Sequence, residues 1–258
     1  PMIDRWALRP AASSSPYRLY EADDRRLIVT GAGRNASTLA ASFLAGHCGV
    51  RGVEGWLNVG IAGSAGHPVG TAILAHKVVD DTTGEIYYPA ITFRPPCPTA
   101  VVQTLNRVER RYAGSDAYEM EASGFCLAAS RFACLEQVQV LKLISDGPES
   151  PAEHITKNTV RDLVANHLPL VEVVIDELDR IGKLVDRQRS DPSNLDRFRD
   201  RWHFTASQQQ QLRRLLRSLE AMGNCNQPTD DSLEGIASGH QVLEVLAGAL
   251  DRSSMRLG

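Results

Sequence analysis

Short apolar runs along residues 26–182 alternate with segments in which apolar residues recur every three or four positions. The runs predict β-strands and the recurring pattern predicts amphipathic helices, because side chains alternate across a strand and repeat every 3.6 residues around a helix. Strands are expected at 26–30, 56–66, 71–80, 101–105 and 137–144, and helices at 36–47, 120–134 and 155–181. Strands that alternate with helices are typical of an α/β fold with a parallel or mixed sheet.

The long helix expected at 155–181 contains an internal proline, Pro169. Proline lacks a backbone N–H and its ring clashes with the preceding turn, so the segment is expected to form two helices or one kinked helix. Gly182 follows the last apolar position of the pattern and is expected to end the helix as its C-cap.

The pattern changes after residue 182, where the chain becomes polar and mixed in charge. A capping box follows, with Thr205 at the N-cap and Gln208 three residues later, and leucines at helical spacing then run to Gly223. A last short helix is expected at 242–250. The chain is therefore expected to divide into an α/β domain at 1–182 and a helical extension at 183–258.

The composition is that of a globular protein without an excess of basic residues. Hydrophobic residues make up 43% and charged residues 23% of the 258 positions, and the formal net charge is -3. Nucleic-acid-binding proteins are usually basic, so no nucleic-acid partner is expected, and Arg213, Arg214 and Arg217 of the extension are interpreted as a solvated helix face. No apolar run is long enough to span a membrane, so no membrane partner is expected.

Cysteine usage indicates a reducing compartment. The five cysteines are an odd number without CxxC spacing, and Cys48, Cys126 and Cys134 lie in apolar helical contexts where buried free thiols are expected. The first residues lack the basic region and apolar core of a signal peptide, so a cytoplasmic protein is expected. Because Pro1 precedes Met2, the first residue is not expected to be a natural start.

A glycine-rich turn joins the first strand to the first helix. Gly31 and Gly33 follow the strand directly, in a strand–turn–helix order that lets backbone N–H groups face a ligand at a helix N-terminus. The full dinucleotide fingerprint G-x-G-x-x-G is absent, since Ala36 occupies the last glycine position. The two glycines either bind a ligand in this way or only permit a tight turn, and the sequence leaves both interpretations open.

Glycines also mark the end of the strand expected at 56–66. Gly60, Gly63 and Gly66 remove side chains there, which often indicates the close approach of a ligand or another backbone segment. Ligands of α/β sheets bind at the carboxyl ends of the strands. Three strand ends, at 30–31, 60–63 and 145–146, are therefore expected to face one crevice.

Two acidic positions near these strand ends suit cleavage of the N-glycosidic bond of a purine nucleoside. A carboxylic acid that protonates the base makes it a better leaving group, and Asp146 suits that role. A carboxylate can hold two sugar hydroxyls, and Glu121 suits that role, with the apolar Met120 beside it against the ribose. The simpler alternatives are that Glu121 is a helix N-terminal acid favoured by the helix dipole, and that Asp146 is a turn residue before Gly147.

On these motifs the chain resembles the nucleoside phosphorylase superfamily, which contains purine nucleoside phosphorylases and methylthioadenosine/S-adenosylhomocysteine nucleosidases. Four landmarks occur in the family's order, namely the glycine-rich turn at 30–36, the strand end N-V-G-I-A-G-S at 58–64, E-M-E-A at 119–122 and I-S-D at 144–146. They span about two thirds of the chain, and their order is more specific than any one of them. The resemblance implies a three-layer α/β fold, with a mixed sheet flanked by helices.

The resemblance also implies roles for individual residues. Asp146 is similar to the family's general acid at purine N7, with Ser145 orienting it. Glu121 is similar to the ligand of the ribose 2′ and 3′ hydroxyls, with Met120 packed on the sugar and Glu119 in a secondary position.

Further positions are assigned from the same family pattern. The backbone wall beside the base corresponds to Ile61, Ala62 and Gly63. The region of the nucleophile corresponds to Gly31, Gly33 and Lys142. The nucleosidases carry an arginine at the position of Lys142, so the positive charge is kept here and the bidentate guanidinium is lost.

Two departures from the family's pattern affect the expected reaction. The nucleosidases carry a water-activating glutamate after their first strand, and residues 1–4 resemble the segment that follows it, so the given residues are expected to lack that strand through trimming, a wrong start or degeneration. The phosphorylases carry a phosphate-binding arginine after the glycine-rich strand end, where residues 64–68 contain none. Arg34 and Arg94 are substitutes that the spacing does not support. Hydrolysis is therefore expected over phosphorolysis.

The leading expectation is an enzyme that cleaves a purine nucleoside or 5′-thio-nucleoside without a metal or cofactor, and that forms a homo-oligomer as family members do. One alternative is a nucleoside phosphorylase, which phosphate dependence would separate from a hydrolase. A second alternative is a non-catalytic nucleoside-binding or interaction protein, motivated by the missing first strand and the C-terminal extension.

Overall fold

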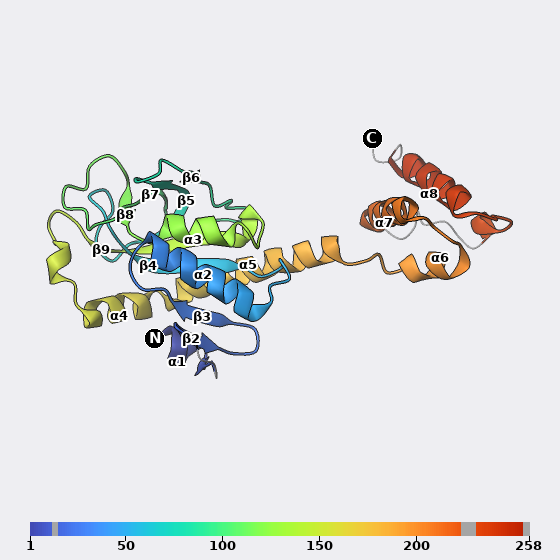
Figure 1. The fold of residues 1–258 in the computed structure, drawn as a ribbon. Helices are drawn as coiled ribbons and strands as arrows, with labels where there is room; N and C mark the ends of the chain where they lie inside the picture. The colour runs from blue at the N-terminus through green and yellow to red at the C-terminus, as the bar shows by residue number, and fades with distance from the viewer. Residues whose placement is uncertain (12–14, 223–230, 255–258) are drawn as a thin grey trace. The chain divides into compact units, whose positions relative to one another are not determined.

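The computed structural model describes residues 1–11, 15–222 and 231–254, which form two compact units. The first unit is Pro1–Val185 and the second is Asp186–Gly258. The division therefore falls close to residue 182, where the composition changes. Figure 1 shows a sheet with helices against it in the first unit and helices in the second.

Six strands form the central mixed sheet of the first unit, in the order β6-β5-β7-β8-β4-β9. They are β4 (Trp56–Gly63), β5 (Ala72–Asp80), β6 (Ile86–Tyr87), β7 (Thr99–Thr104), β8 (Ala117–Glu119) and β9 (Val138–Asp146). β5 pairs in parallel with β7 and also antiparallel with β9, so the sheet closes on itself. β9 is buried along its whole length, as expected for a strand covered on both faces.

Helices cover both faces of this sheet (Figure 1). On one face lie α2 (Arg34–Cys48) and α3 (Ala122–Ala129), whose small side chains pack against β4, β5, β7 and β9. On the other face, α5 (Leu168–Arg189) packs through Val174 and Leu178 against Leu74 and Leu141. This arrangement confirms the expected α/β fold, a mixed sheet between helices.

The strand expected at 26–30 does form, as β3 (Arg26–Val29), but it lies outside the central sheet. It pairs with β2 (Arg18–Glu21), which pairs with β1 (Arg9–Pro10), in a separate antiparallel sheet. The short helix α1 (Met2–Arg5) precedes it, held by the Arg5 Nε–Glu172 Oε1 ion pair at 2.8 Å. The three strand ends therefore do not belong to one sheet.

The segment after β9 contains two helices, α4 (Lys157–Asn166) and α5, as the internal proline predicted. The expectation that Gly182 ends the second helix is wrong, because α5 continues to Arg189. Gly182 is buried within α5, where a side chain would clash with the Val53 carbonyl oxygen. The glycine is thus required by close packing. The helix expected at 120–134 is also shorter, and α3 is followed by turns and the 3-10 helix η1 (Leu135–Gln137).

The second unit is built from α6 (Leu195–Arg201), α7 (Ala206–Ala221), the 3-10 helix η4 (Asp231–Leu233) and α8 (Gly239–Ser254). Its own apolar core includes Phe198, Trp202, Leu216 and Leu246. The helix α8 is longer than expected, and α6 was not expected at all.

The capping box at the start of α7 is confirmed. The Thr205 hydroxyl accepts from the Gln208 N–H at 3.4 Å, and the Gln208 side chain accepts from the Thr205 N–H at 2.9 Å. The expected stop at Gly223 lies outside the described residues. Arg213 and Arg217 are half-buried rather than fully solvated, since Arg213 pairs with Asp191 at 2.7 Å and Arg217 donates to the Ser190 carbonyl oxygen.

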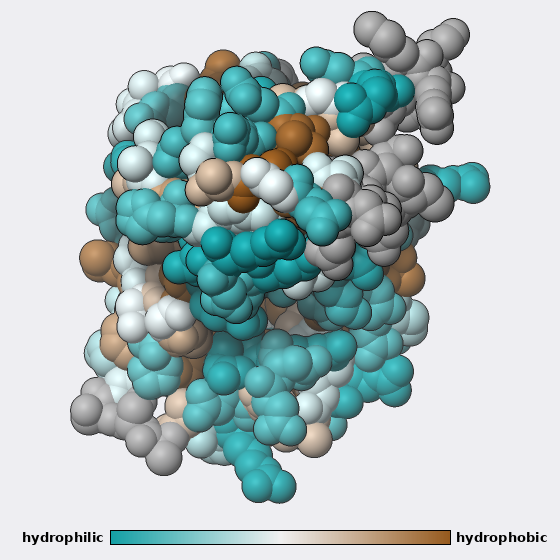
Figure 2. Space-filling model, turned by 90° about the vertical axis from the view of Figure 1, so that its right-hand side faces the viewer, coloured by the Kyte–Doolittle hydropathy of each residue, from teal (hydrophilic) through white to brown (hydrophobic). Residues whose placement is uncertain are grey.

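Hydrophilic side chains predominate on the face of the molecule shown in Figure 2, and hydrophobic ones lie there in small separate groups. This distribution is ordinary for a folded protein whose apolar side chains are largely buried. Among the helices of the described residues, none has the length and apolar character needed to cross a membrane.

Candidate functional site

The ends of β4 and β9 lie side by side, because the two strands run parallel and Gly63 pairs with Asp146, after a one-residue shift in register at Ser145. The Ser64 N–H donates to the Asp146 carbonyl oxygen at 2.9 Å, which fixes this alignment. β8 reaches the same point from the other side of β4, where Tyr118 pairs with Gly63. Three segments that are distant in sequence thus meet at one edge of the sheet.

The Asp146 side chain is held by two hydroxyl groups at this edge. The Ser145 hydroxyl donates to Oδ1 at 2.6 Å and the Tyr112 hydroxyl donates to Oδ2 at 2.8 Å. Asp146 is only 6% exposed, so its orientation is well defined by these bonds. Ser145 was predicted to orient Asp146, and that role would require a hydrogen bond of this kind.

Gly63 leaves room for the Asp146 carboxyl group. A side chain at this position would clash with Asp146 Oδ2 and would lie 2.6 Å from Tyr112 Cε1. Ala62 is buried just before it and Ile61 is half-buried, and these two residues pair with Ile144 and Leu143 of β9. The strand end predicted as the base wall therefore faces the predicted general acid.

Tyr112 is a site residue that the sequence analysis missed. It lies in the irregular segment between β7 and β8, among charged residues, and has a φ of 49°, which is uncommon for a residue with a side chain. Burial and then the hydrogen bond to Asp146 raise the pKa of its hydroxyl. Its sequence signal is faint, a single aromatic residue within a run of arginine and glutamate.

Glu121 lies where the glycine-rich turn meets the start of α3. The Gly33 N–H donates to Glu121 Oε1 at 2.8 Å, across 88 residues of sequence. Gly31 and Gly33 have φ values of 80° and 102°, in a region that glycine adopts at little cost. The turn thus has the conformation that its glycines allow. One of its N–H groups donates to Glu121, the residue predicted to bind the ribose. Met120 and Glu121 are both half-buried.

Glu119 is buried beneath this point rather than open to a ligand. One carboxylate oxygen accepts from the Thr104 hydroxyl at 2.5 Å, and the other accepts from the N–H groups of Glu121 and Ala122 at 2.8 Å. Lys142 Nζ lies 2.7 Å from the second oxygen, and the lysine side chain is 1% exposed. The structure thus places Glu119 and Lys142 in a buried ion pair at the N-terminus of α3.

A second buried acid extends this polar network. Asp80, at the end of β5, accepts from the Ser123 hydroxyl at 2.7 Å and from Arg34 Nη1 at 3.2 Å. Burial raises the pKa of Asp80, but hydrogen bonds from Ser123, Thr83 and Thr82 and the charge of Arg34 outweigh this effect and hold the pKa below its usual value. Arg34, the cation on the glycine-rich turn, is thereby engaged by a carboxylate of the protein itself.

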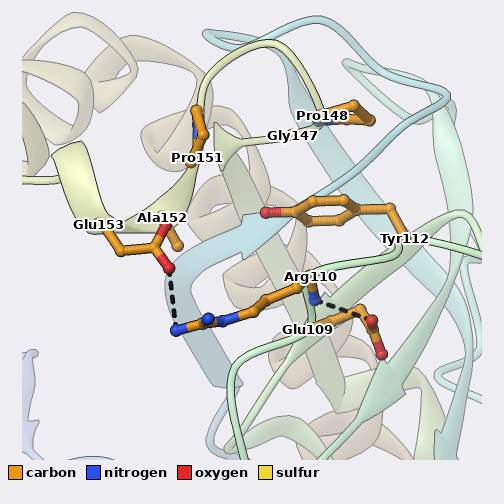
Figure 3. A pocket seen from close by; sticks show the side chains of 8 residues that line it. All are labelled: Glu109, Arg110, Tyr112, Gly147, Pro148, Pro151, Ala152 and Glu153. Carbon is orange, nitrogen blue, oxygen red and sulfur yellow. Dashed lines mark hydrogen bonds and ion pairs between the residues drawn. The ribbon is translucent and has the colours of Figure 1, made fainter.

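An open pocket of about 220 Å³ is lined in part by Tyr112. Its lining residues are Glu109, Arg110, Tyr112, Gly147, Pro148, Pro151, Ala152 and Glu153, the last two from the 3-10 helix η2 (Ala152–His154). Figure 3 shows the Tyr112 ring reaching across the pocket, with the Arg110–Glu153 ion pair, 3.0 Å long, on one side of it. Within the described ranges, no group of three or more acidic, histidine or cysteine side chains is placed to bind a metal.

Comparison with known proteins gives a match in fold alone. No protein-family model matches the sequence, and no curated protein matches it.

The fold is similar to that of a 5′-methylthioadenosine/S-adenosylhomocysteine nucleosidase from Neisseria meningitidis in complex with methylthio-immucillin-A. The TM-score is 0.53 at 15% identity, over 67% of this chain and 94% of that one. It is also similar to the nucleosidase of Colwellia psychrerythraea in complex with adenine, with a TM-score of 0.51 at 16% identity over 67% and 86% of the two chains. A futalosine hydrolase mutant of Helicobacter pylori gives a TM-score of 0.53 at 14% identity over 69% and 93%.

These structures belong to the nucleoside phosphorylase and nucleosidase superfamily, and this chain has their fold. The fold that the resemblance implied is thereby confirmed.

Proposed function

We propose that this protein hydrolyses the N-glycosidic bond of a purine nucleoside, in particular a 5′-thio-nucleoside. The observation that carries the proposal is the meeting of Gly63 with Asp146 and Ser145 at the end of two parallel strands. Similarity of fold to nucleosidases that bind adenine and methylthio-immucillin-A supports the choice of a purine nucleoside.

In the proposed reaction Asp146 donates its proton to N7 of the base. The electron pair of the C1′–N9 bond then moves onto the base, which leaves as a neutral purine, and positive charge develops on the ribose ring. Water attacks C1′ and loses a proton to the solvent, which gives the free sugar with its 5′ substituent. The hydrogen bond from the Ser145 hydroxyl fixes the orientation of the Asp146 carboxyl group, which supports the role proposed for Asp146. A general acid must be held within hydrogen-bonding distance of the atom that it protonates.

Glu121 is proposed to bind the 2′ and 3′ hydroxyls of the ribose, with Met120 against the sugar. The Gly33 N–H fixes Glu121 Oε1. The other carboxylate oxygen, Oε2, is proposed to bind the sugar hydroxyls. Glu119 and Lys142 are proposed to act indirectly, by holding the start of α3 and so the position of Glu121. No residue is assigned as the base that activates water.

Hydrolysis is favoured over phosphorolysis by the position of Arg34. A phosphate site needs a cation that is free to bind the anion, and Arg34 Nη1 is already 3.2 Å from the buried carboxylate of Asp80. The other arginine considered, Arg94, is exposed in the irregular segment before β7.

The proposal is tested by incubating the full chain with 5′-methylthioadenosine, S-adenosylhomocysteine or inosine, with and without phosphate, and measuring free base and sugar by chromatography. Free base and free sugar are expected without phosphate. Sugar phosphate, formed only with phosphate, would show a phosphorylase instead. Calorimetric binding of a nucleoside without turnover would show the non-catalytic alternative.

The Asp146→Asn variant is expected to lose at least about 100-fold in kcat, because general acid catalysis typically contributes a factor of 10²–10⁴ and an amide does not supply the proton. The matched control is Asp162→Asn, at an exposed position of α4. Equal rates for Asp146→Asn and the control would remove Asp146 from the proposed role.

A further inference from the structure

The place beside Asp146 where the base is proposed to bind is filled by the Tyr112 side chain. The Tyr112 hydroxyl donates to Asp146 Oδ2 at 2.8 Å, and its ring lies beside Gly63, where an added Cβ atom would lie 2.6 Å from Cε1. Tyr112 is 7% exposed, and Tyr118 packs edge-on against it with ring centroids 6.3 Å apart. A base that contacts both Gly63 and Asp146 must therefore take the place of this ring.

The segment that carries Tyr112 is not part of a helix or strand. Residues 105–116 join β7 to β8 as bends and stretches without regular structure, and Tyr112 itself has a φ of 49°. The Glu109 carboxylate accepts from the N–H groups of Arg110 and Arg111, which gives the segment local hydrogen bonds of its own. A backbone held in this uncommon conformation next to a candidate site is consistent with a functional constraint on Tyr112.

Space for the displaced side chain is present beside it. The pocket of about 220 Å³ borders Tyr112, and Pro148, Pro151 and Ala152 give it partly apolar walls (Figure 3). The Arg110–Glu153 ion pair on its edge is largely exposed, so it opposes movement of the segment only weakly. The ring can therefore turn into this pocket and contact its apolar walls there.

We infer that Tyr112 is a specificity-determining residue of the base subsite, which the base enters only by displacing the Tyr112 hydroxyl from Asp146. The inference rests on the proposed function. It implies that the hydroxyl competes with the base for one carboxyl oxygen, and that a base unable to form a hydrogen bond with Asp146 is excluded. Removing the hydroxyl while keeping the ring removes the competitor.

The test compares Tyr112→Phe with the wild type, by calorimetric titration with adenine and by steady-state cleavage of 5′-methylthioadenosine. Hydrogen bonds to charged groups are strong enough that the variant is expected to bind adenine about tenfold more tightly. Its KM is expected to fall by about the same factor, with kcat within about twofold of the wild type. A residue with only a structural role would not lower KM when changed.

Tyr118→Phe is the matched control, because Tyr118 is also buried and its hydroxyl accepts from the Ser115 N–H at 2.7 Å, away from Asp146. It is expected to leave adenine affinity unchanged. Equal or weaker adenine binding by Tyr112→Phe, in a protein whose wild type binds adenine, overturns the inference and leaves the proposed function standing. Failure of both the wild type and the variant to bind adenine or release base overturns both.

Discussion

Replacing Lys142 with methionine is expected to destabilise the first unit by about 3 kcal/mol, although no ligand contact is lost. Lys142 lies on the fully buried strand β9, and its Nζ is 2.7 Å from Glu119 Oε2. A side chain at Gly60 of β4 would lie 3.0 Å from the same nitrogen, so the ammonium group fills the space that this glycine leaves. Methionine has a similar length but no charge, so the substitution leaves the buried Glu119 carboxylate without its counter-ion.

The expected loss of stability depends on which hydrogen bonds and charges remain around the partner that is not substituted. Removing one member of a buried ion pair typically costs about 3–5 kcal/mol. Without Lys142, Glu119 keeps hydrogen bonds from the Thr104 hydroxyl and from the N–H groups of Glu121 and Ala122, so the lower end of that range is expected. Glu119→Gln is expected near the upper end, because Lys142 loses its counter-ion and the new amide group faces donors.

The measurement is hydrogen exchange of the β9 amides in increasing urea, which reports unfolding of the first unit without interference from the second. Lys157→Met, at an exposed position of α4, is the control and is expected to change the free energy of unfolding by less than about 0.5 kcal/mol. The Glu119→Gln/Lys142→Met double variant is expected to lose at least about 1 kcal/mol less than the sum of the single losses, because the two side chains are in contact. Strict additivity, or a Lys142→Met effect no larger than that of the control, would show that Glu119 and Lys142 do not form a stabilising buried pair.

Two further outcomes are expected. Gly63→Ala places a methyl group against Asp146 Oδ2 and Tyr112 Cε1, and is expected to abolish base release. Circular dichroism is expected to show that the variant stays folded. Wild-type rates in this variant would contradict the geometry described for the end of β4. The folded-state pKa of Asp80 lies below its usual value, so the stability it contributes is present above about pH 4 and is lost as the pH falls through the folded pKa. Asp80→Asn is therefore expected to flatten the fall of the urea midpoint below about pH 4, and an unchanged slope would count against that role.

The strands around the site were predictable because their signals are local. Apolar residues predominate in β9 up to Ile144, and β4 ends at Gly63, where a side chain would clash with Asp146. The glycine-rich turn was recognisable as a turn because glycine adopts positive φ at little cost, and Gly31 and Gly33 both do so. The partnership of Gly33 with Glu121 was not predictable from periodicity, because it depends on how α2 and α3 pack.

Long-range pairing explains the features that the sequence analysis missed. β3 has the same short apolar pattern as a central strand, and only its pairing with β2 shows that it belongs to another sheet. Lys142 interrupts an apolar run, and its partner Glu119 is distant in sequence, so the buried pair has no local signature. Tyr112 is brought to Asp146 by a segment without regular structure, where no periodic pattern exists to be interpreted.

The most direct test of the central claim is a crystal structure of the Asp146→Asn variant with 5′-methylthioadenosine, since loss of the acid is expected to leave the bound nucleoside intact. The base is expected to lie against Gly63 and the side chain of residue 146, the ribose hydroxyls to contact Glu121, and the Tyr112 hydroxyl to lie away from residue 146. A nucleoside bound elsewhere on the first unit, or one whose ribose does not contact Glu121 while Tyr112 stays in place, would contradict the central claim.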